Sequence, residues 1–268
     1  MKHVAVIGVG NMGKILSKAI ASHHPDLQIS LLTRRPEKIT EFAKEIQATI
    51  IQDKDKLAMI KEADLIIVCI KPHQFDAYFN QLYDHLERIK PKTWVSIAVG
   101  KSLAQLQQLT PAGHRWIRLM PNTPTAVGQG YMAMCHPQDM DADTVQDVRQ
   151  LFQKSAIVQV FDEAYFNTVS AISGSGPAFM YQLMEAMADA AVKHGLKREQ
   201  AYQMVGQLLV GSGHMLLESG KHPGQLKDEV TSPGGTTIEG VSSLEKDGFR
   251  WAIINAIDQT INKASSLN

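Results

Sequence analysis

The sequence is poor in cysteine: only Cys69 and Cys135 occur among its 268 residues. Two isolated cysteines give no disulfide framework and suit a reducing compartment, so we expect a cytoplasmic protein. The chain also lacks an excess of charge, because lysine plus arginine and aspartate plus glutamate number 27 each. A balanced charge predicts no binding to nucleic acid or to a membrane surface. The apolar run at 65–70 is far too short to span a bilayer, and the chain enters its first strand at once, so we expect no cleavable signal.

Several catalytic signatures are missing as well. The sequence has no His-Glu-x-x-His, Cys-x-x-Cys or G-x-S-x-G motif, so we expect neither a metal site nor an acyl-transfer nucleophile. Its ten histidines are scattered, and no acid–base pair stands out. Hydride transfer to an electrophilic centre needs no such pair, because the cofactor carries the chemistry.

The first part of the chain alternates strand-like and helix-like segments. Continuous apolar runs separated by amphipathic helices predict a mainly parallel sheet that is covered on both faces. The predicted strands lie at 3–10, 28–33, 49–51, 64–70, 93–99 and 115–120, with further edge strands in GYMAM and AIVQVF. After Phe161 every segment has helical periodicity and no strand-like run remains.

These patterns predict two domains and an α/β fold. We expect a doubly wound domain with a mainly parallel sheet at 1–162 and an all-helical domain at 163–268. Residues 178–193 form a helix with small and apolar residues on most faces. Such a helix is typical of a subunit interface, and a central helix of a monomeric bundle is the alternative.

The stretch GVGNMG places Gly8, Gly10 and Gly13 in a G-x-G-x-x-G pattern between the first strand and a helix. In that context Gly8 permits the tight turn, Gly10 lets the backbone approach a pyrophosphate, and Gly13 lets helix and strand pack closely. The helix N-terminus adds N–H groups and partial positive charge. We therefore predict a dinucleotide site and a Rossmann-type domain at 1–162.

The end of the second strand indicates which dinucleotide binds. NAD sites usually carry an acidic residue there, whereas this chain has Thr33, Arg34 and Arg35. Guanidinium groups suit a 2′-phosphate. We therefore expect NADPH as cofactor, with NADH as a weaker substitute; the alternative is a solvated basic turn.

Three further clusters are rich in small or polar residues. MPNTP (120–124) follows a strand and carries Asn122 at the expected cofactor crevice, with a rigid inter-domain turn as the alternative. SGSGPA (173–178) connects two helices, and a plain corner is its alternative. VTSPGGTTIEG (230–240) brings hydroxyls and backbone N–H groups to a helix start, which suits a carboxylate or phosphate; a capped turn is the alternative.

Five motifs in sequence order resemble the pyrroline-5-carboxylate reductase family. They are IGVGNMG, VCIKP, RLMPNTP, ISGSGPAF and HPGQLKDEVTSPGGTTIEG, and they extend over almost the whole chain. The last of them is highly specific. The resemblance implies reduction of L-1-pyrroline-5-carboxylate to L-proline, the last step of proline biosynthesis, with hydride from NADPH.

The resemblance also implies roles for individual residues. The pyrophosphate loop would comprise Gly8, Gly10, Asn11, Met12 and Gly13, with Thr33, Arg34 and Arg35 near the adenosine ribose. Lys71 and Pro72 would border the cofactor, and Asn122 would lie near the nicotinamide. The substrate carboxylate would be held by Ser232, Gly234, Gly235, Thr236 and Thr237, with Thr237 as the catalytic partner of the ring nitrogen. Members dimerise through the helical domain and often build rings of dimers, such as a decamer.

Three other functions remain open at this stage. A related β-hydroxyacid dehydrogenase or another cyclic-imine reductase would share the cofactor domain, but Lys193 and Lys197 do not lie in the lysine motif that the dehydrogenases carry. A non-catalytic regulator that binds NADP could keep every glycine, and an assay with NADPH and pyrroline-5-carboxylate separates it from an enzyme.

Overall fold

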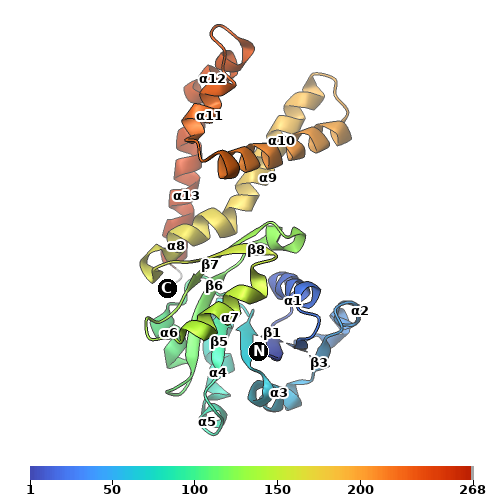
Figure 1. Cartoon of the computed structure of the whole chain (residues 1–268), viewed down its shortest axis with the longest axis vertical. Helices are drawn as coiled ribbons and strands as arrows, with labels where there is room; N and C mark the ends of the chain where they lie inside the picture. The colour runs from blue at the N-terminus through green and yellow to red at the C-terminus, as the bar shows by residue number, and fades with distance from the viewer. Residues whose placement is uncertain (267–268) are drawn as a thin grey trace. The chain divides into compact units, whose positions relative to one another are not determined.

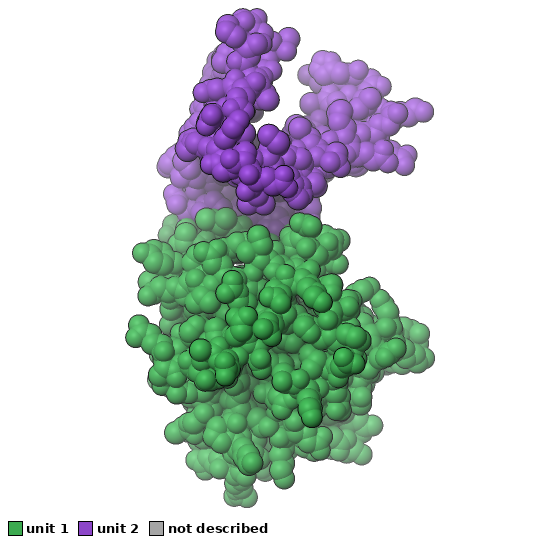
Figure 2. Space-filling view, viewed as in Figure 1, with its two compact units in different colours: residues 1–175, 260–268 green, residues 176–259 purple. Residues whose placement is uncertain are grey.

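The computed structural model describes residues 1–266, so the last two residues of the predicted helical domain, 267–268, lie outside it. The chain forms two compact units (Figure 2). The first comprises residues 1–175 and 260–266, and the second comprises residues 176–259. The sequence changes from strands to helices near residue 162, whereas the contacts divide the chain later, after Ser175.

The first unit contains one eight-stranded sheet in the order β3-β2-β1-β4-β5-β6-β7-β8 (Figure 1). All neighbouring strands are parallel except the antiparallel pair β6 and β7. The strands are β1 (His3–Ile7), β2 (Gln28–Leu32), β3 (Thr49–Ile51), β4 (Leu65–Val68), β5 (Thr93–Ser96), β6 (Arg115–Met120), β7 (Gly130–Cys135) and β8 (Ala156–Val160). The predicted doubly wound, mainly parallel sheet is confirmed.

Helices and short turns connect these strands. The α-helices are α1 (Asn11–His23), α2 (Thr40–Glu45), α3 (Lys56–Glu62), α4 (Phe75–Asn80), α5 (Tyr83–Leu86), α6 (Leu103–Gln108), α7 (Ala142–Phe152) and α8 (Phe166–Val169). The 3-10 turns are η1 (Pro36–Lys38), η2 (Asp53–Asp55), η3 (Pro72–Gln74), η4 (Thr123–Val127) and η5 (Glu163–Tyr165), and η6 (Ser170–Ser175) is a π-helical turn.

The remaining helices are α9 (Gly176–Lys193), α10 (Arg198–Ser219), α11 (Pro223–Glu229), α12 (Thr236–Lys246) and α13 (Phe249–Ser265). α9 and α10 pack against each other within the second unit. The predicted succession of helices after the sheet is confirmed. The first segment after Phe161, DEAYFNTVSAI (162–172), has helical periodicity but does not form one continuous helix: it contributes to η5, α8 and the π-helical turn η6.

Helices cover both faces of the sheet. Neighbouring residues of each strand point to opposite faces, so each strand contributes to both hydrophobic cores. In β1, Val4 and Val6 pack with residues of α1, α2 and α7, whereas Ala5 and Ile7 pack with residues of α3, α4, α5 and α6. A strand that is buried on both faces must be apolar throughout, which is why the strands are recognisable in the sequence. Because β1 to β6 run parallel, their carboxyl ends lie at one edge of the sheet.

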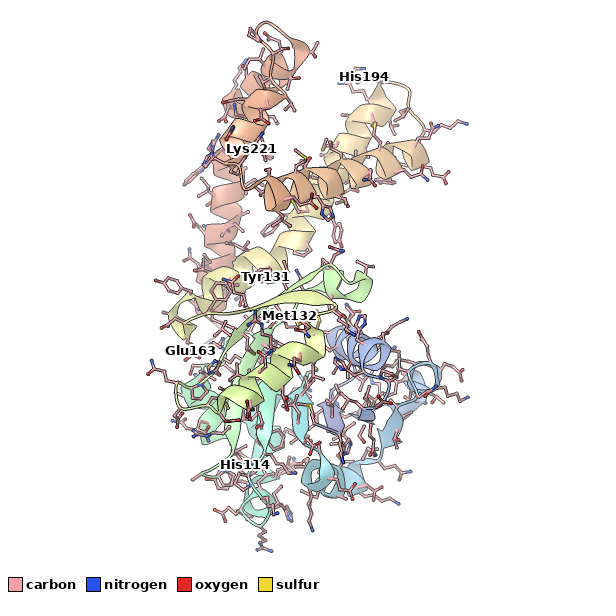
Figure 3. All side chains as sticks on the ribbon, in the orientation of Figure 1. His114, Tyr131, Met132, Glu163, His194 and Lys221 are labelled. Atoms are coloured by element: carbon pink, nitrogen blue, oxygen red, sulfur yellow. The ribbon has the colours of Figure 1, made fainter. Side chains whose placement is uncertain are left out.

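His114 strengthens the join between β5 and β6 (Figure 3). Its Nδ1 accepts hydrogen bonds from the Lys92 backbone N–H and the Trp94 Nε1–H, both at 3.2 Å. Burial lowers the pKa of the imidazole, so the ring stays neutral and its Nε2–H faces the Leu86 carbonyl at 3.3 Å. This histidine has a structural role in the first unit.

Candidate functional site

The glycine loop between β1 and α1 contains two glycines that no larger residue can replace. Gly8 has φ +93°, and a Cβ there would lie 2.8 Å from the carbonyl carbon of Cys69. A Cβ on Gly13 would lie 2.2 Å from the Gly8 carbonyl oxygen. Gly10 differs, because no atom lies within 4 Å of the position its Cβ would take. Two glycines thus close the turn, and the third leaves open space in front of the helix.

The N-terminus of α1 faces that open space. Gly10 is the N-cap residue, and no side chain caps the helix. Asn11 is exposed and Met12 is half-buried, so the first-turn N–H groups are available to a ligand. Uncapped N–H groups and the positive end of a 13-residue helix dipole suit a pyrophosphate. The loop therefore fits a dinucleotide.

The loops after β2 and β4 flank the glycine loop, because β1 lies between these two strands. Thr33 follows β2, and its Oγ1 accepts a hydrogen bond from the Arg35 N–H at 3.3 Å. Arg34 and Arg35 are exposed. Lys71 precedes η3, where its N–H donates to Gln74 Oε1 at 3.1 Å. Among residues 1–266 none of the side chains of these two arginines and this lysine forms an ion pair, which leaves positive charge at this edge of the sheet.

Asn122 lies after β6 at the same edge, but its side chain is engaged within the protein. It is 7% exposed. Its Oδ1 accepts a hydrogen bond from the Tyr131 N–H at 3.0 Å, and its Nδ2 donates to the Ser173 carbonyl at 3.1 Å. Both ends of the amide are thus used by the fold itself.

The predicted substrate turn lies in the second unit, between α11 and α12. The Gly235 N–H donates to the Ser232 carbonyl at 3.1 Å, and a Cβ on Gly235 would lie 2.3 Å from Ser232 Oγ. Gly234 has φ +67°, which favours glycine. Gly235 is the N-cap residue of α12, without a side-chain cap. The fold therefore builds a tight turn that leads into an open helix start.

Hydroxyl groups surround that helix start. Ser232, Thr236 and Thr237 are exposed, and Thr236 and Thr237 are the first two residues of α12. Among the described residues, the hydroxyls of Ser232 and Thr237 have no hydrogen-bond partner. Glu239 in the first turn opposes an anion by its charge. Uncapped N–H groups together with free hydroxyls nevertheless suit a carboxylate.

The thiol nearest the glycine loop is inert. Cys69 follows β4, and burial raises the pKa of its thiol to about 12. The same cause raises the pKa of Cys135 to about 12. Both cysteines are unpaired. Neither thiol ionises near neutral pH, so neither is an activated nucleophile.

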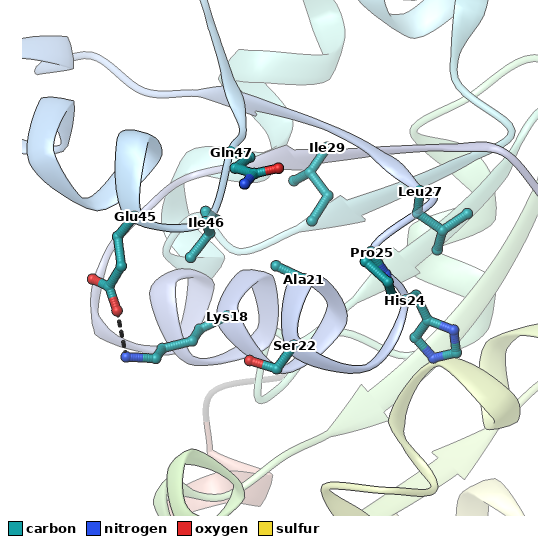
Figure 4. Close-up of a pocket in the computed structure, with 10 residues that line it drawn as sticks. All are labelled: Lys18, Ala21, Ser22, His24, Pro25, Leu27, Ile29, Glu45, Ile46 and Gln47. Carbon is teal, nitrogen blue, oxygen red and sulfur yellow. Dashed lines mark hydrogen bonds and ion pairs between the residues drawn. The ribbon is translucent and has the colours of Figure 1, made fainter.

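A pocket of about 260 Å³ lies elsewhere in the first unit (Figure 4). It is lined by the end of α1, the start of β2 and the turn after α2, and the Lys18–Glu45 ion pair forms part of its wall. The start of β2 is at the edge opposite the glycine loop, and none of the predicted site residues lines the pocket. We therefore assign it no part in the reaction.

Two features were not predicted from the sequence. Arg118 is buried, and its Nη1 contacts Glu163 Oε1 at 2.7 Å while its guanidinium lies 4.1 Å from the centre of the Phe166 ring. Glu163, labelled in Figure 3, also accepts the Leu103 N–H at 2.6 Å. A charged residue within the apolar strand RWIRLM was the available signal, since a buried charge requires a partner. The π-helical turn η6 had no comparable signal.

In residues 1–266 no three metal-ligating side chains cluster, and no helix there is long and apolar enough to cross a membrane.

Two family models match the chain. Residues 3–100 match the family described as NADP oxidoreductase coenzyme F420-dependent, and residues 163–267 match pyrroline-5-carboxylate reductase dimerisation. Together with the doubly wound sheet and its glycine loop, these matches define an NADP-dependent oxidoreductase of the Rossmann type.

Relatives at full length identify the family. The chain is 38% identical to pyrroline-5-carboxylate reductase of Escherichia coli, over 100% of this chain and 98% of that protein. It is 36% identical to the enzyme of Pisum sativum, over 98% and 94%. The crystal structure of Plasmodium falciparum pyrroline carboxylate reductase with NADP bound superposes with a TM-score of 0.89 at 27% identity, over 99% and 98%. The chain belongs to the pyrroline-5-carboxylate reductase family, which excludes the rival dehydrogenase.

Proposed function

We propose that this chain uses an anion-binding helix start in each unit to reduce L-1-pyrroline-5-carboxylate to L-proline. When bound, NADPH supplies the hydride, which adds to the imine carbon while the C=N π electrons neutralise the protonated ring nitrogen. A protonated imine is strongly electrophilic, so positioning supplies much of the catalysis. The observation that carries the proposal is the glycine loop, with Gly8 and Gly13 closing the turn and Gly10 facing open space.

The test is oxidation of NADPH by the purified protein. Absorbance of the reduced nicotinamide should fall only when both protein and pyrroline-5-carboxylate are present, and L-proline should accumulate in equal amount. Absence of oxidation at saturating substrate would favour a non-catalytic NADP-binding protein.

The cofactor roles rest on the carboxyl edge of the sheet. We assign the pyrophosphate to the loop formed by Gly8, Gly10, Asn11, Met12 and Gly13, because its N–H groups are uncapped. Thr33, Arg34 and Arg35 would meet the adenosine ribose and its 2′-phosphate, and Lys71 with Pro72 would border the cofactor from the neighbouring loop. The unpaired cations after β2 and β4 support this assignment.

Replacing both Arg34 and Arg35 with Ala should weaken NADPH binding at least about tenfold, because a charge-assisted hydrogen bond contributes about 1.5–3 kcal/mol. NADH binding should change little, since NADH has no 2′-phosphate. Titrations of nucleotide fluorescence measure both affinities. The double replacement Lys61→Ala and Lys90→Ala, which removes the same charge at the opposite edge of the sheet, is the control. An equal loss of affinity for NADPH and for NADH would show that the arginines do not contact the 2′-phosphate.

The substrate roles rest on the turn of the second unit. We propose that Ser232, the Gly234 and Gly235 backbone and Thr236 hold the carboxylate of the imino acid. Thr237 would place its hydroxyl on the ring nitrogen. The support is local: a tight glycine turn, an uncapped helix of 11 residues, and hydroxyls without partners among the described residues.

We also propose a homodimer, with rings of dimers such as a decamer as a larger form. Within one chain the second unit buries few apolar residues: Ala188 in α9, and Ala201 and Val205 in α10. Large apolar residues of this unit that remain exposed include Met180, Tyr181, Tyr202, Met204, Leu208, Val210, Met215, Leu216, Leu217, Val230, Leu244 and Trp251. A soluble monomer rarely exposes so much apolar surface in one region, and the match to a dimerisation family agrees with this proposal.

Light scattering on dilute protein should give the mass of two chains or a multiple of two. Trp251 is 65% exposed, and Trp251→Glu should raise the dissociation constant of the assembly at least about 100-fold, because tryptophans dominate such interfaces. Tyr83→Glu, on α5 of the first unit, should leave the mass unchanged. A stable, active wild-type monomer would refute the dimer.

We propose that the protein acts in the cytoplasm. The support is the unpaired state of Cys69 and Cys135, which suits a reducing compartment.

A further inference from the structure

Pro177 removes a hydrogen bond near the start of α9. In an α-helix the N–H of residue 177 would donate to the carbonyl of Ser173, four residues earlier. Proline has no N–H, so Ser173 loses this donor. The chain just before it, η6, is a π-helical turn, and such turns are common where a helix meets a functional site. The Ser173 carbonyl therefore lacks its α-helical donor, and a donor from outside the helix can take that place.

The donor is the side chain of Asn122. Its Nδ2 lies 3.1 Å from the Ser173 carbonyl, and its Oδ1 lies 3.0 Å from the N–H of Tyr131, which is labelled in Figure 3. One contact requires a donor and the other an acceptor, so the orientation of the amide is fixed. With 7% exposure and both ends bonded, this side chain is not free to bind a ligand.

The same contact holds the end of β6. β6 ends at Met120, and a Cβ on Gly174 would lie only 3.4 Å from Met120 Sδ, so η6 packs directly on the strand end. Asn122 is the N-cap residue of η4, and its bond to Tyr131 ties it to the start of β7. The segments MPNTP and SGSGPA, which are separate in the sequence, thus form one hydrogen-bonded assembly at the carboxyl edge of the sheet.

We propose that Asn122 is a positioning residue: its amide replaces the hydrogen bond that Pro177 cannot make, and so fixes the backbone of residues 121–124 beside the nicotinamide. A direct contact between the Asn122 amide and the cofactor is the alternative. Ligands of doubly wound sheets bind at the carboxyl ends of the strands, so a shift of this loop would misplace the reacting groups. The proposal rests on the reduction of pyrroline-5-carboxylate by this chain.

Asn122→Ala should lower kcat at least about tenfold, because misplacement by about 1 Å costs up to about 100-fold. The dissociation constant of NADPH should change less than about twofold, since its phosphates and adenosine bind at other strands. The melting temperature should fall by about 5 °C. In the Pro177→Ala background, where residue 177 regains an N–H for Ser173, Asn122→Ala should cost at most about threefold in kcat and half of that melting shift.

Ser170→Ala is the matched control. Ser170 is buried in the same turn, and its Oγ donates to the Phe166 carbonyl at 2.6 Å, away from Asn122. This variant should melt earlier but keep kcat within about twofold of the wild type. A tenfold loss of NADPH affinity in Asn122→Ala would overturn the proposal in favour of a direct contact. Equal losses from Asn122→Ala with and without the Pro177→Ala replacement, or a tenfold loss of kcat in Ser170→Ala, would overturn it too.

Wild-type turnover is measured first in the same assay. An inactive wild type would contradict the assigned reaction, and the melting-temperature coupling between Asn122 and Pro177 would still decide whether the hydrogen bond replaces the missing one.

Discussion

Gly13→Ala should destabilise the first unit by about 3 kcal/mol and abolish measurable binding of NADPH. The added Cβ would lie 2.2 Å from the Gly8 carbonyl oxygen, which is a backbone atom and cannot rotate away. Either α1 or the turn after β1 must then move, and the N–H groups for the pyrophosphate move with it. Urea denaturation and titration of nucleotide fluorescence measure the two effects.

Gly10→Ala is the matched comparison in the same loop. Its Cβ would meet no atom within 4 Å, and φ −79° suits alanine, so the loss of stability should stay below about 1 kcal/mol. NADPH affinity should nevertheless fall at least about tenfold, because the methyl group occupies the space that the pyrophosphate needs. A Gly10→Ala protein that binds NADPH like the wild type would place the cofactor elsewhere, and a fully stable Gly13→Ala protein would contradict the packing described for this loop.

Thr237→Val should lower kcat/KM for pyrroline-5-carboxylate about 10- to 150-fold, because it removes a hydrogen-bond donor from a charged site and keeps the shape. Ser232→Ala should also lower kcat/KM, because it removes a hydroxyl that we assign to the substrate carboxylate. NADPH affinity should stay within about twofold in both variants, since the glycine loop is in the first unit. Steady-state kinetics and nucleotide titration measure these quantities.

Two comparisons isolate the carboxylate. A cyclic imine without a carboxylate should be a poor substrate for the wild type. The kcat/KM for this imine should change little in Ser232→Ala. Thr231→Val is the control variant, because the Thr231 hydroxyl already donates to the Lys227 carbonyl at 2.6 Å and supports the end of α11. Wild-type kcat/KM in both Ser232→Ala and Thr237→Val would mean that residues 232–237 form only a turn between helices.

The sheet was predictable because its signals are local. A strand such as Leu65–Val68 is buried on both faces and must be apolar throughout, and a glycine loop next to it must keep a fixed spacing. The helix start at Thr236 was predictable for the same reason, since paired glycines precede it directly. Each of these elements could be predicted because a few consecutive residues determine its local geometry.

The contacts that hold the segments together were not predictable in the same way. Asn122 and Ser173 are 51 residues apart, and Arg118 and Glu163 are 45 residues apart, so no local pattern pairs them. Asn122 therefore resembled a residue that contacts a ligand, although its amide is used within the fold. The π-helical turn at 170–175 packs against Met120, and helical periodicity alone cannot show that contact.

Hydride transfer to the imine carbon is the central claim, and isotope transfer tests it most directly. The purified protein is supplied with pyrroline-5-carboxylate and with NADPH that carries deuterium at both C4 positions of the nicotinamide, and the proline is examined by mass spectrometry and NMR. The account predicts L-proline heavier by one mass unit, with the deuterium on C5. Unlabelled proline, or label at another carbon, would contradict it.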